Sequence, residues 1–405
     1  MRSWPITAIP KMDISSLPFL KLFDSASRDF VSVGNKDSAS LYVCGITPYD
    51  ATHMGHAATY IAFDLVHRYW AVSGLPVKFV QNITDIDDPL LVRASERHLD
   101  WQKLAEGEID LFREDMSALR VLPPHHYMGA VETIPLVIDA IEKLIKLQLT
   151  YWIGPDLYFR YSKFERSHAL AHLSDSEKIE IFGQRGGDPT RNGKEDPLDC
   201  LLWQGEKPGE PSWESPWGMG RPGWHIECTA IAQEFLGSSI QIQGGGSDLI
   251  FPHHEMGSAQ AECISGKEFA RAYVHTGMIG LDGEKMSKSR GNLVFVSDLR
   301  RKHDPNAIRL ALLMGHYRSN RDWSNDLLSQ AENKLSFWRI TLAHSLGTDS
   351  TSTIEKIVES LSNDLDTPAA IAHIDDWMNE QKGTGDVSGP GKITRAIDAL
   401  LGLAL

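Results

Sequence analysis

The sequence predicts an α/β fold built on a parallel sheet, with an inserted domain and a C-terminal helical domain. Two apolar, strand-like runs at 41–43 and 77–83 each end in a polar turn, and a helical pattern that begins at His53 lies between them. Such a strand–helix–strand unit implies a parallel sheet with its ligand site beyond the carboxyl ends of the strands. A chain of 405 residues exceeds one ordinary core, which predicts two or three domains.

Composition and charge narrow the classes of function. The apolar fraction of 42% and the charged fraction of 23% are typical of a soluble globular protein, and no apolar run is long enough to cross a bilayer. Four cysteines in a chain of this length do not form a disulfide framework, so we expect a cytoplasmic protein whose thiols bind metal or act in catalysis. The net charge of −14 argues against a nucleic-acid partner.

The insertion is expected between Pro123 and Pro197, where a helical pattern, two short strand-like runs and a polar loop follow one another. The run LDCLLW at 198–203 is expected to resume the central sheet, and the chain after 305 reads as helical. The expected divisions, in chain order, are 1–122 (first half of the catalytic domain), 123–197 (insertion), 198–282 (second half), 283–330 (mobile loop and connecting fold) and 331–405 (helical domain).

Two motifs point to chemistry on a phosphate. HMGH at 53–56 places two histidines at the start of a helix, where free backbone N–H groups and the helix dipole favour an anion. KMSKS at 285–289 places Lys285 and Lys288 on a loop between glycines that can close over phosphates. Each motif alone is as easily a chance pair of histidines or a solvated basic loop. Together they predict that His53, His56, Lys285 and Lys288 stabilise charge at a reacting phosphate.

A thiol and imidazole set forms a candidate metal site. Cys44 ends a strand, Cys228 lies early in a helix, and His253 follows the run GGGSDLIFP. Thiolate and imidazole ligands suit zinc, and three protein ligands leave one position open. From the spacing alone, unrelated buried residues are the commoner explanation. His225 and His254 are competing ligands, and we read the other two cysteines, Cys200 and Cys263, as core residues.

Three weaker signals accompany these. Glycines 244–246 let a backbone approach a nucleotide, and Asp248 beyond them can bind ribose hydroxyls, although a glycine run alone is more often a turn. Trp224 can wall a small substrate, although an isolated Trp is more often core. An acidic turn, which a solvated surface explains equally well, can bind an amine or magnesium through Asp85, Asp87 and Asp88.

The motifs resemble class I aminoacyl-tRNA synthetases, and within them the cysteinyl branch. HMGH is similar to the class motif HIGH, KMSKS matches the second motif, and NITDIDD, PGWHIEC and GGGSDLIFPHHE resemble cysteinyl blocks over residues 20–330. The resemblance implies a Rossmann-like parallel sheet of the class I type, with an inserted connective domain. It also places the family's zinc ligands on Cys44, Cys228 and His253.

Three departures from the synthetase resemble a related family, the cysteine ligases of mycothiol biosynthesis. The synthetase's fourth zinc ligand falls on Gly257, and its CGPTVYD block reads CGITPYD here. Residues 331–405 hold six Lys plus Arg and eleven Asp plus Glu, so they offer no basic surface for tRNA. The blocks CGITPYDATHMGHA and QRGGDP resemble the ligase family, with Gln184 where a Glu is usual, which puts any ionic role at 184 in doubt.

The resemblance implies an ATP-dependent ligase that joins L-cysteine to the amine of glucosaminyl-inositol through a zinc-anchored cysteinyl-adenylate. Its expected partners are ATP (as Mg-ATP), cysteine and the amino sugar, without tRNA or membrane, and the expected state is a monomer. The alternatives are a minimal cysteinyl-tRNA synthetase and a non-catalytic, zinc-bearing paralogue. The residues that the resemblance places around the adenylate are Cys44, Gly45, Ile46, Thr47, Thr59, Asn82, Ile83, Thr84, Trp224, Gly246, Ser247, Asp248 and Ile279.

Overall fold

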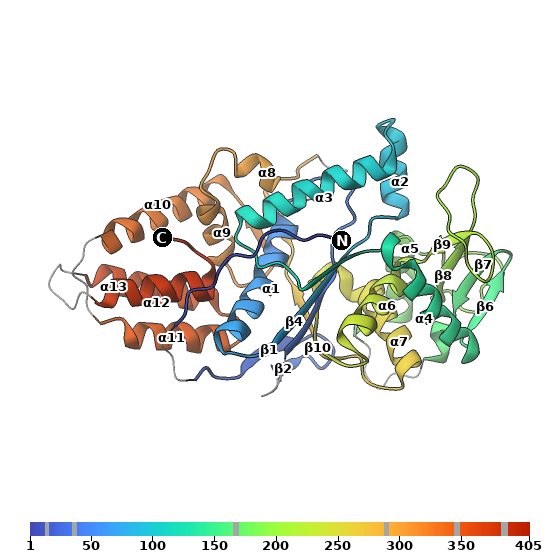
Figure 1. Cartoon of the computed structure of the whole chain (residues 1–405), viewed down its shortest axis with the longest axis horizontal. Helices are drawn as coiled ribbons and strands as arrows, with labels where there is room; N and C mark the ends of the chain where they lie inside the picture. The colour runs from blue at the N-terminus through green and yellow to red at the C-terminus, as the bar shows by residue number, and fades with distance from the viewer. Residues whose placement is uncertain (13–15, 35–38, 165–169, 287–290, 344–348, 382–387) are drawn as a thin grey trace.

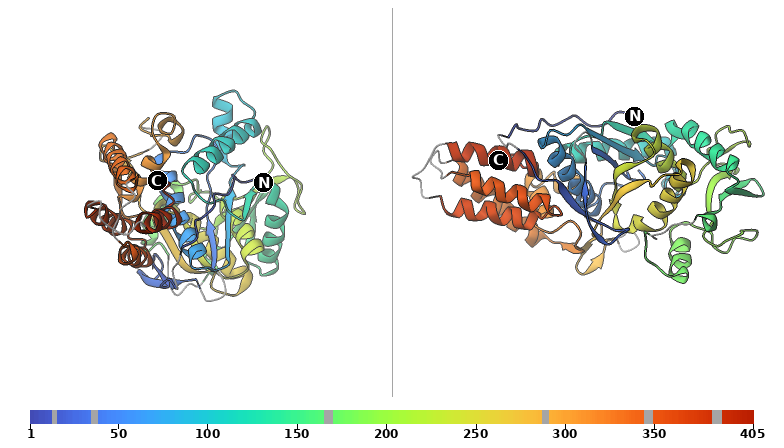
Figure 2. Two further views of the ribbon diagram at one scale, coloured as in Figure 1. Left: turned by 60° about the vertical axis from the view of Figure 1, so that its left-hand side comes forward. Right: turned by 90° about the horizontal axis from the view of Figure 1, so that it is seen from below.

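A five-stranded parallel sheet lies at the centre of the chain, in a computed structural model that describes residues 1–12, 16–34, 39–164, 170–286, 291–343, 349–381 and 388–405. A helical bundle lies at one end of the long axis and a small antiparallel sheet with its helices at the other (Figure 1). The same succession is seen from below in Figure 2. The fold class predicted from the sequence is confirmed.

The central sheet has the strand order β11-β10-β3-β4-β5, and all of its neighbours pair in parallel. The carboxyl ends of its strands therefore meet at one edge, which is where the polar motifs of the sequence fall. The strands are β3 (Ala39–Val43), β4 (Val77–Ile83), β5 (His126–Gly129), β10 (Ile240–Gly246) and β11 (Ala270–Thr276).

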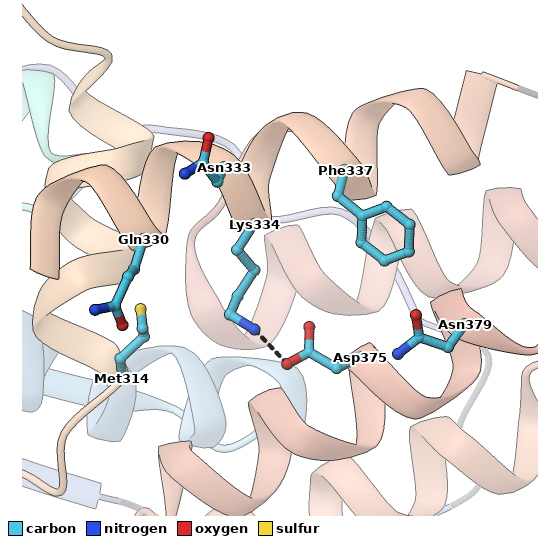
Figure 3. Close-up of a pocket in the computed structure, with 7 residues that line it drawn as sticks. All are labelled: Met314, Gln330, Asn333, Lys334, Phe337, Asp375 and Asn379. Atoms are coloured by element: carbon cyan, nitrogen blue, oxygen red, sulfur yellow. Dashed lines mark hydrogen bonds and ion pairs between the residues drawn. The ribbon is translucent and has the colours of Figure 1, made fainter. Parts of the chain in front are cut away.

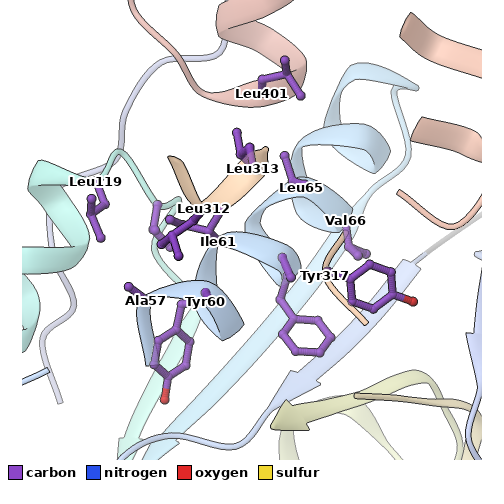
Figure 4. Packing of buried hydrophobic residues seen from close by; sticks show 14 of the residues in the cluster. Ala57, Tyr60, Ile61, Leu65, Val66, Leu119, Leu312, Leu313, Tyr317 and Leu401 are labelled. Atoms are coloured by element: carbon purple, nitrogen blue, oxygen red, sulfur yellow. The ribbon is translucent and has the colours of Figure 1, made fainter. Parts of the chain in front are cut away.

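Helix α1 (Met54–Val72) packs across this sheet and against the C-terminal part of the chain. Its residues Ala57, Ile61 and Leu65 are buried, and Figure 4 shows them facing Leu312 and Leu313. Tertiary packing of an apolar face supplies most of the stability of such a helix. The helix is capped by His53 and ends before Gly74, as the sequence predicts.

The insertion forms a second sheet, and here one prediction is wrong. The run at 198–203 was expected to return to the central sheet, but β8 (Cys200–Gly205) pairs antiparallel with β7 and β9 in the order β6-β7-β8-β9. An apolar run of this length is a buried strand in either sheet, so its composition could not identify its partner. The other elements of this part are η1 (Val131–Thr133), α4 (Ile134–Lys146), β6 (Thr150–Ile153), β7 (Asp156–Phe159), η2 (Tyr161–Lys163), α5 (Asp175–Gln184) and β9 (Gly220–Pro222).

The remaining elements flank the sheet or form the C-terminal bundle. Strands β1 and β2 form an antiparallel hairpin, and the chain after 305 is helical as predicted except for the short strand β14. The flanking elements are β1 (Leu20–Asp24), β2 (Asp29–Val33), α2 (Asp88–Glu96), α3 (Trp101–Ala118), α6 (Trp224–Leu236), η3 (Ser247–Leu249), η4 (Ile250–His254), α7 (Glu255–Ser265), β12 (Ile279–Leu281), β13 (Glu284–Lys285), α8 (Val296–Leu299) and β14 (Arg321–Trp323). The helical elements that follow are α9 (Pro305–Leu313), α10 (Asn325–Ala343), α11 (Thr351–Ser362), α12 (Thr367–Asn379), α13 (Ser388–Ala396) and η6 (Ile397–Leu401).

The glycine run 244–246 belongs to strand β10 and is required by packing. A Cβ at Gly244 would lie 2.3 Å from the ring of Phe63 on α1. We expect Gly244→Ala to destabilise the protein by about 1–3 kcal/mol, because overpacking forces the helix and sheet apart. A urea titration measures this. The matched control is Gly107→Ala at an exposed position of helix α3, where nothing lies within 4 Å of the added carbon and a gain of up to about 1 kcal/mol is expected. A Gly244→Ala variant as stable as the control would contradict the packing.

Among the described residues, no helix combines the length and the apolar character needed to cross a bilayer.

Candidate active site

A cavity of about 400 Å³ opens at the carboxyl edge of the central sheet, between the end of β3, the start of α1 and the strand β12. Eleven of the residues expected at the site line it: Cys44, Gly45, Ile46, Thr47, His53, His56, Thr59, Trp224, Gly246, Asp248 and Ile279. The topology of the sheet thus brings together motifs that lie more than 200 residues apart in the sequence.

Further lining residues were missed by the sequence analysis. Thr276 ends strand β11, and its hydroxyl lies 2.8 Å from that of Thr59. Its place at the end of a buried strand is a signal that could have identified it, as are the positions of Tyr49 and Asp50 within CGITPYD. The full set of missed residues is Tyr49, Asp50, Ala51, Gly55, Tyr60, Leu249, Thr276, Gly277, Met278, Met286 and Leu293.

Four residues expected around the adenylate do not line the cavity: Asn82, Ile83, Thr84 and Ser247. Asn82 is buried, and its side-chain oxygen accepts a hydrogen bond from Gly45 N at 2.9 Å. Thr84 N donates to Ile46 O at 3.0 Å. A Cβ at Gly45 would lie 1.7 Å from Asn82 O, so only glycine allows this close approach. The end of β4 therefore supports the backbone of residues 45–46 through these contacts.

The two histidines of HMGH lie together at the start of α1. His53 caps the helix, with its Nδ1 accepting from Gly55 N at 3.1 Å. The rings of His53 and His56 stack with centroids 3.8 Å apart. Burial and the neighbouring His53 hold the pKa of His56 well below its usual value. His56 is therefore neutral at physiological pH, and one of its ring nitrogens can donate to a phosphate oxygen.

The two lysines of KMSKS are at the limit of what the structure describes. The backbone of Lys285 lies in β13 and pairs with Gly280 of β12, beside the cavity-lining Ile279. Lys288 lies outside the described residues. The contacts of both amino groups with a phosphate stay a prediction.

The three expected metal ligands form a buried cluster. The Sγ atoms of Cys44 and Cys228 are 4.0 Å apart, and His253 Nε2 lies 3.3 Å from Cys228 Sγ. The ligand atoms of Cys44, Cys228 and His253 all lie within 4.8 Å of one another. Strand β3, helix α6 and the segment η4 each supply one ligand, and Cys44 also lines the cavity.

The protonation of the two thiols fits a soft metal ion. A hydrogen bond from Cys44 and the neighbouring His253 hold the pKa of Cys228 well below its usual value, against the effect of burial. Burial raises the pKa of Cys44, and the Cys228 thiolate raises it further. These directions favour the thiolate at Cys228, which is the form that binds a metal ion. Two sulfurs and one imidazole nitrogen, with one side facing a cavity, suit zinc with an open position.

The competing ligands His225 and His254 each contact one member of the cluster but do not belong to the group of three. His225 Nδ1 is 3.1 Å from His253 Nδ1, and His254 Nε2 is 3.2 Å from Cys44 Sγ. Burial keeps the pKa of both rings well below the usual value, so both are neutral. Each contacts one member of the cluster from the side, as a ring that orients a ligand does.

Trp224 forms a wall of the cavity beside the cluster. Its ring stacks on His253 with centroids 4.3 Å apart and an interplanar angle of 23°. A flat indole against the imidazole fixes the direction of that ring and narrows the space beside the two sulfurs. This position suits the small side-chain end of a substrate.

The acidic turn is held by protein partners and does not line the cavity. Asp85 accepts from Val131 N at 2.9 Å, Asp87 caps α2, and Asp88 pairs with Arg221. Burial raises the pKa of Asp85 and of Asp87 to about 6. Binding of an amine or of magnesium by this turn stays a prediction.

At two positions where the sequence departs from the family patterns, 184 and 257, the side chain makes no contact with the cavity or the cluster. Gln184 Nε2 donates to Glu180 Oε1 at 3.0 Å on the exposed face of α5, away from the cavity. Gly257 offers no side chain toward the cluster, and its carbonyl accepts from the hydroxyl of Thr229 at 2.9 Å. The cluster of three ligands therefore has no carboxylate from position 257.

A second cavity of about 470 Å³ lies between α10 and α12 of the helical bundle (Figure 3). Lys334 and Trp338 both donate to Asp375 there, so the carboxylate is already paired. None of the expected site residues lines this cavity.

Comparisons with known proteins identify the family of the chain. The model of the family described as tRNA synthetases class I (C) catalytic domain matches residues 30–333. A protein of Segniliparus rotundus, named L-cysteine:1D-myo-inositol 2-amino-2-deoxy-alpha-D-glucopyranoside ligase, is 52% identical over all of both chains. The equally named proteins of Thermobispora bispora and Mycolicibacterium smegmatis are 52% and 51% identical, again over all of both chains. The chain belongs to this ligase family.

Solved structures show how widely the fold of the ligase family is shared. The methionyl-tRNA synthetase of Mycobacterium tuberculosis in complex with methionyl-adenylate has a TM-score of 0.64. The alignment covers 90% of this chain and 89% of that one at 14% identity, so the likeness concerns the fold alone. Membership of this family makes the chain a ligase, with the fold of the class I synthetases.

Proposed function

We propose that the protein joins L-cysteine to the amine of glucosaminyl-inositol at the expense of ATP, through a cysteinyl-adenylate. The observation that carries this is the cluster of Cys44, Cys228 and His253 opening into a cavity whose other wall holds HMGH. The printed names of the full-length relatives support cysteine and the amino sugar as substrates. In such a reaction the first half activates the carboxylate, and the second transfers it to the amine.

In the first half-reaction, a cysteine carboxylate oxygen attacks the α-phosphorus of Mg-ATP and diphosphate leaves. His53 and His56, which stack on each other and line the cavity, would donate to the oxygens of that phosphorus, where negative charge develops. Lys285 and Lys288 would neutralise the leaving diphosphate. Gly246, Asp248 and Ile279, which line the same cavity, would hold the nucleoside.

Cysteine is selected at the cluster. Zinc bound to Cys44, Cys228 and His253 would supply a position that stabilises the substrate thiol as a thiolate. A hydroxyl is harder and less acidic, so serine would be rejected without editing. Trp224 excludes water beside that position and limits the size of the side chain.

In the second half-reaction, the neutral sugar amine attacks the carbonyl carbon of the adenylate. The C–N bond forms, AMP leaves with the electrons of the C–O bond, and the amine loses a proton. The enzyme holds the two reacting groups in one cavity, which converts a bimolecular step into an effectively unimolecular one. We further propose a cytoplasmic location, because both cluster thiols must stay reduced to bind metal.

Product formation from ATP, cysteine and one acceptor at a time tests the proposal. We expect AMP release with an amide product from glucosaminyl-inositol, and no charging of tRNA. Cysteine-dependent exchange of pyrophosphate into ATP provides the control for the first half-reaction. Charging of tRNA in place of the sugar would establish a minimal synthetase, and absence of both exchange and product would establish a non-catalytic paralogue.

A further inference from the structure

Helix α5 of the insertion contacts the segment that carries the metal ligand His253 at two points. Arg185, at the C-terminal end of α5, donates through one nitrogen to the carbonyl oxygens of Asp248 and Phe251. Lys178, two turns earlier, donates to Glu255 at 2.7 Å. The contacts fall two residues before and two residues after His253, so they bracket the ligand.

The carbonyl groups that Arg185 binds need a partner from outside the segment. Phe251 has extended dihedral angles, φ −136° and ψ 135°, inside a run that is otherwise helical. Its carbonyl therefore points away from the helical hydrogen-bond pattern, and Phe251 is buried. A buried carbonyl without a partner costs free energy, and a charged donor is a strong one. Arg185 satisfies this group and the carbonyl of cavity-lining Asp248 together.

The second contact is a buried ion pair. Glu255 is 1% exposed, and its carboxylate accepts from Lys178 Nζ, from the hydroxyl of Tyr161 and from Ala171 N. Three partners that all come from the insertion leave Glu255 fully paired. The helix α7 that begins at Glu255 is thereby fixed to the insertion at its first residue.

The block QRGGDP positions Arg185 for its contact with Asp248 and Phe251. Gly186 has a φ of +86°, which turns the chain directly after Arg185. A Cβ at Gly187 would lie 2.5 Å from the ring of Phe182, so the turn packs closely on α5. Asp188 accepts from Tyr158 of β7 and from Lys194, which ties the turn to the antiparallel sheet. The block thus joins the sheet of the insertion to the 248–255 segment through one side chain.

We propose that Arg185 and Lys178 are positioning residues that hold His253 in its metal-binding orientation and Asp248 in its nucleotide-binding orientation. The inference rests on the metal site of the proposed function and deepens it. Neither residue lines the cavity, so both act through the segment that they hold. In metal sites, removal of a partner behind a ligand typically lowers metal affinity by about 10–100-fold.

The test uses the whole chain loaded with zinc and compares Arg185→Met, Arg185→Lys and Lys178→Met. The matched control is Arg191→Met, which removes an arginine from the same loop. Arg191 binds Tyr158, Asp156 and Asp188 within the insertion and forms no hydrogen bond or ion pair with the described residues 248–255. Three readouts are followed: the rate of zinc release to a chelator, the sulfur-to-metal absorption of the cobalt-substituted protein, and kcat and KM for ATP in pyrophosphate exchange.

We expect Arg185→Met to release zinc about tenfold faster or more, to change the cobalt spectrum and to raise the KM for ATP. Arg185→Lys, which keeps a charged donor, should restore part of each effect. Lys178→Met should accelerate zinc release with a smaller effect on the KM for ATP, because Lys178 donates its hydrogen bond to Glu255 and not to the backbone of Asp248. The control should leave all three readouts near the wild-type values.

The outcomes separate this inference from the proposal on which it rests. If the wild type retains zinc and Arg185→Met and Lys178→Met release it at the wild-type rate, the inference is overturned and the metal site stands. The same holds if Arg191→Met reproduces the changes, since a loosened insertion would then explain them. A wild type that retains no zinc under any condition overturns the metal site and the inference together.

Discussion

Replacing Cys44 with serine is expected to release the metal and to abolish cysteine-dependent exchange of pyrophosphate into ATP. Cys44 supplies one of the two sulfurs of the cluster and is the ligand that also lines the cavity. A structural zinc site is worth about 10–16 kcal/mol over four ligands, so one ligand accounts for about 3 kcal/mol, or about a hundredfold in affinity. Because the substrate thiol uses the same ion, exchange should fall at least as far.

Metal content and the exchange assay, measured on the same preparation, check this result. The matched control is Cys263→Ser, which removes a half-buried thiol outside the cluster. It should retain both the metal and the activity. A Cys44→Ser variant that retains zinc with normal exchange would refute the ligand assignment. Loss of zinc with unchanged exchange would instead separate the metal from the selection of cysteine.

The parts of the fold that were predicted correctly are those where local pattern and topology agree. The run at 41–43, the helix after His53 and the run at 77–83 follow one another as strand, helix and strand. This order predicts that the two strands pair in parallel, as β3 and β4 do. The strand at 198–203 was assigned to the wrong sheet because its apolar residues suit any buried strand. Partner choice is a tertiary property that composition does not encode.

The candidate site was predicted through residues with distinctive chemistry. Cys44, Cys228 and His253 form a group in space, although their spacing in the sequence gave unrelated core residues as the commoner explanation. Asn82 and Thr84 follow a strand just as cavity residues do, but in this structure they hold the backbone of the neighbouring loop. Whether a polar side chain faces a ligand or another chain segment depends on packing, which the linear pattern does not contain.

The sequence also gave no sign of a buried charge network that joins α1 to the end of the chain. Asp64 accepts from Arg68 Nε at 2.7 Å, from Arg309 and from Leu122 N at 2.7 Å. Arg309 also donates to Leu401 O at 2.6 Å and to Leu119 O at 2.8 Å. Charges on a helix usually indicate a solvated face, yet the side chains of Asp64, Arg68 and Arg309 are fully buried.

Replacing Arg309 with methionine is expected to destabilise the protein by about 3–5 kcal/mol, because it leaves carbonyl groups and part of the Asp64 carboxylate buried without a donor. Burial lowers the pKa of Arg309 to about 10, so the side chain is charged at neutral pH and its loss removes a full charge. A urea titration at pH 7 gives the free energy of unfolding. The control is Arg301→Met, an exposed arginine that pairs with Asp298 at 3.5 Å, with an expected cost below about 1 kcal/mol.

The pH dependence gives the network a second test. Burial alone would raise the pKa of Asp64, but Arg68 and Arg309 outweigh it and hold that pKa below 3.8. A carboxylate whose pKa is lower in the folded state contributes stability above pH 3.8 and loses it as the pH falls through the folded value. The wild type should therefore lose stability in acid. Arg309→Met should lose less over the same pH range, because removal of the Arg309 charge lets the pKa of Asp64 in the folded state rise toward or above its unfolded value. Equal acid sensitivity of the two proteins, or a loss at pH 7 no larger than that of Arg301→Met, would show that Arg309 does not stabilise the junction of α1 with the C-terminal residues.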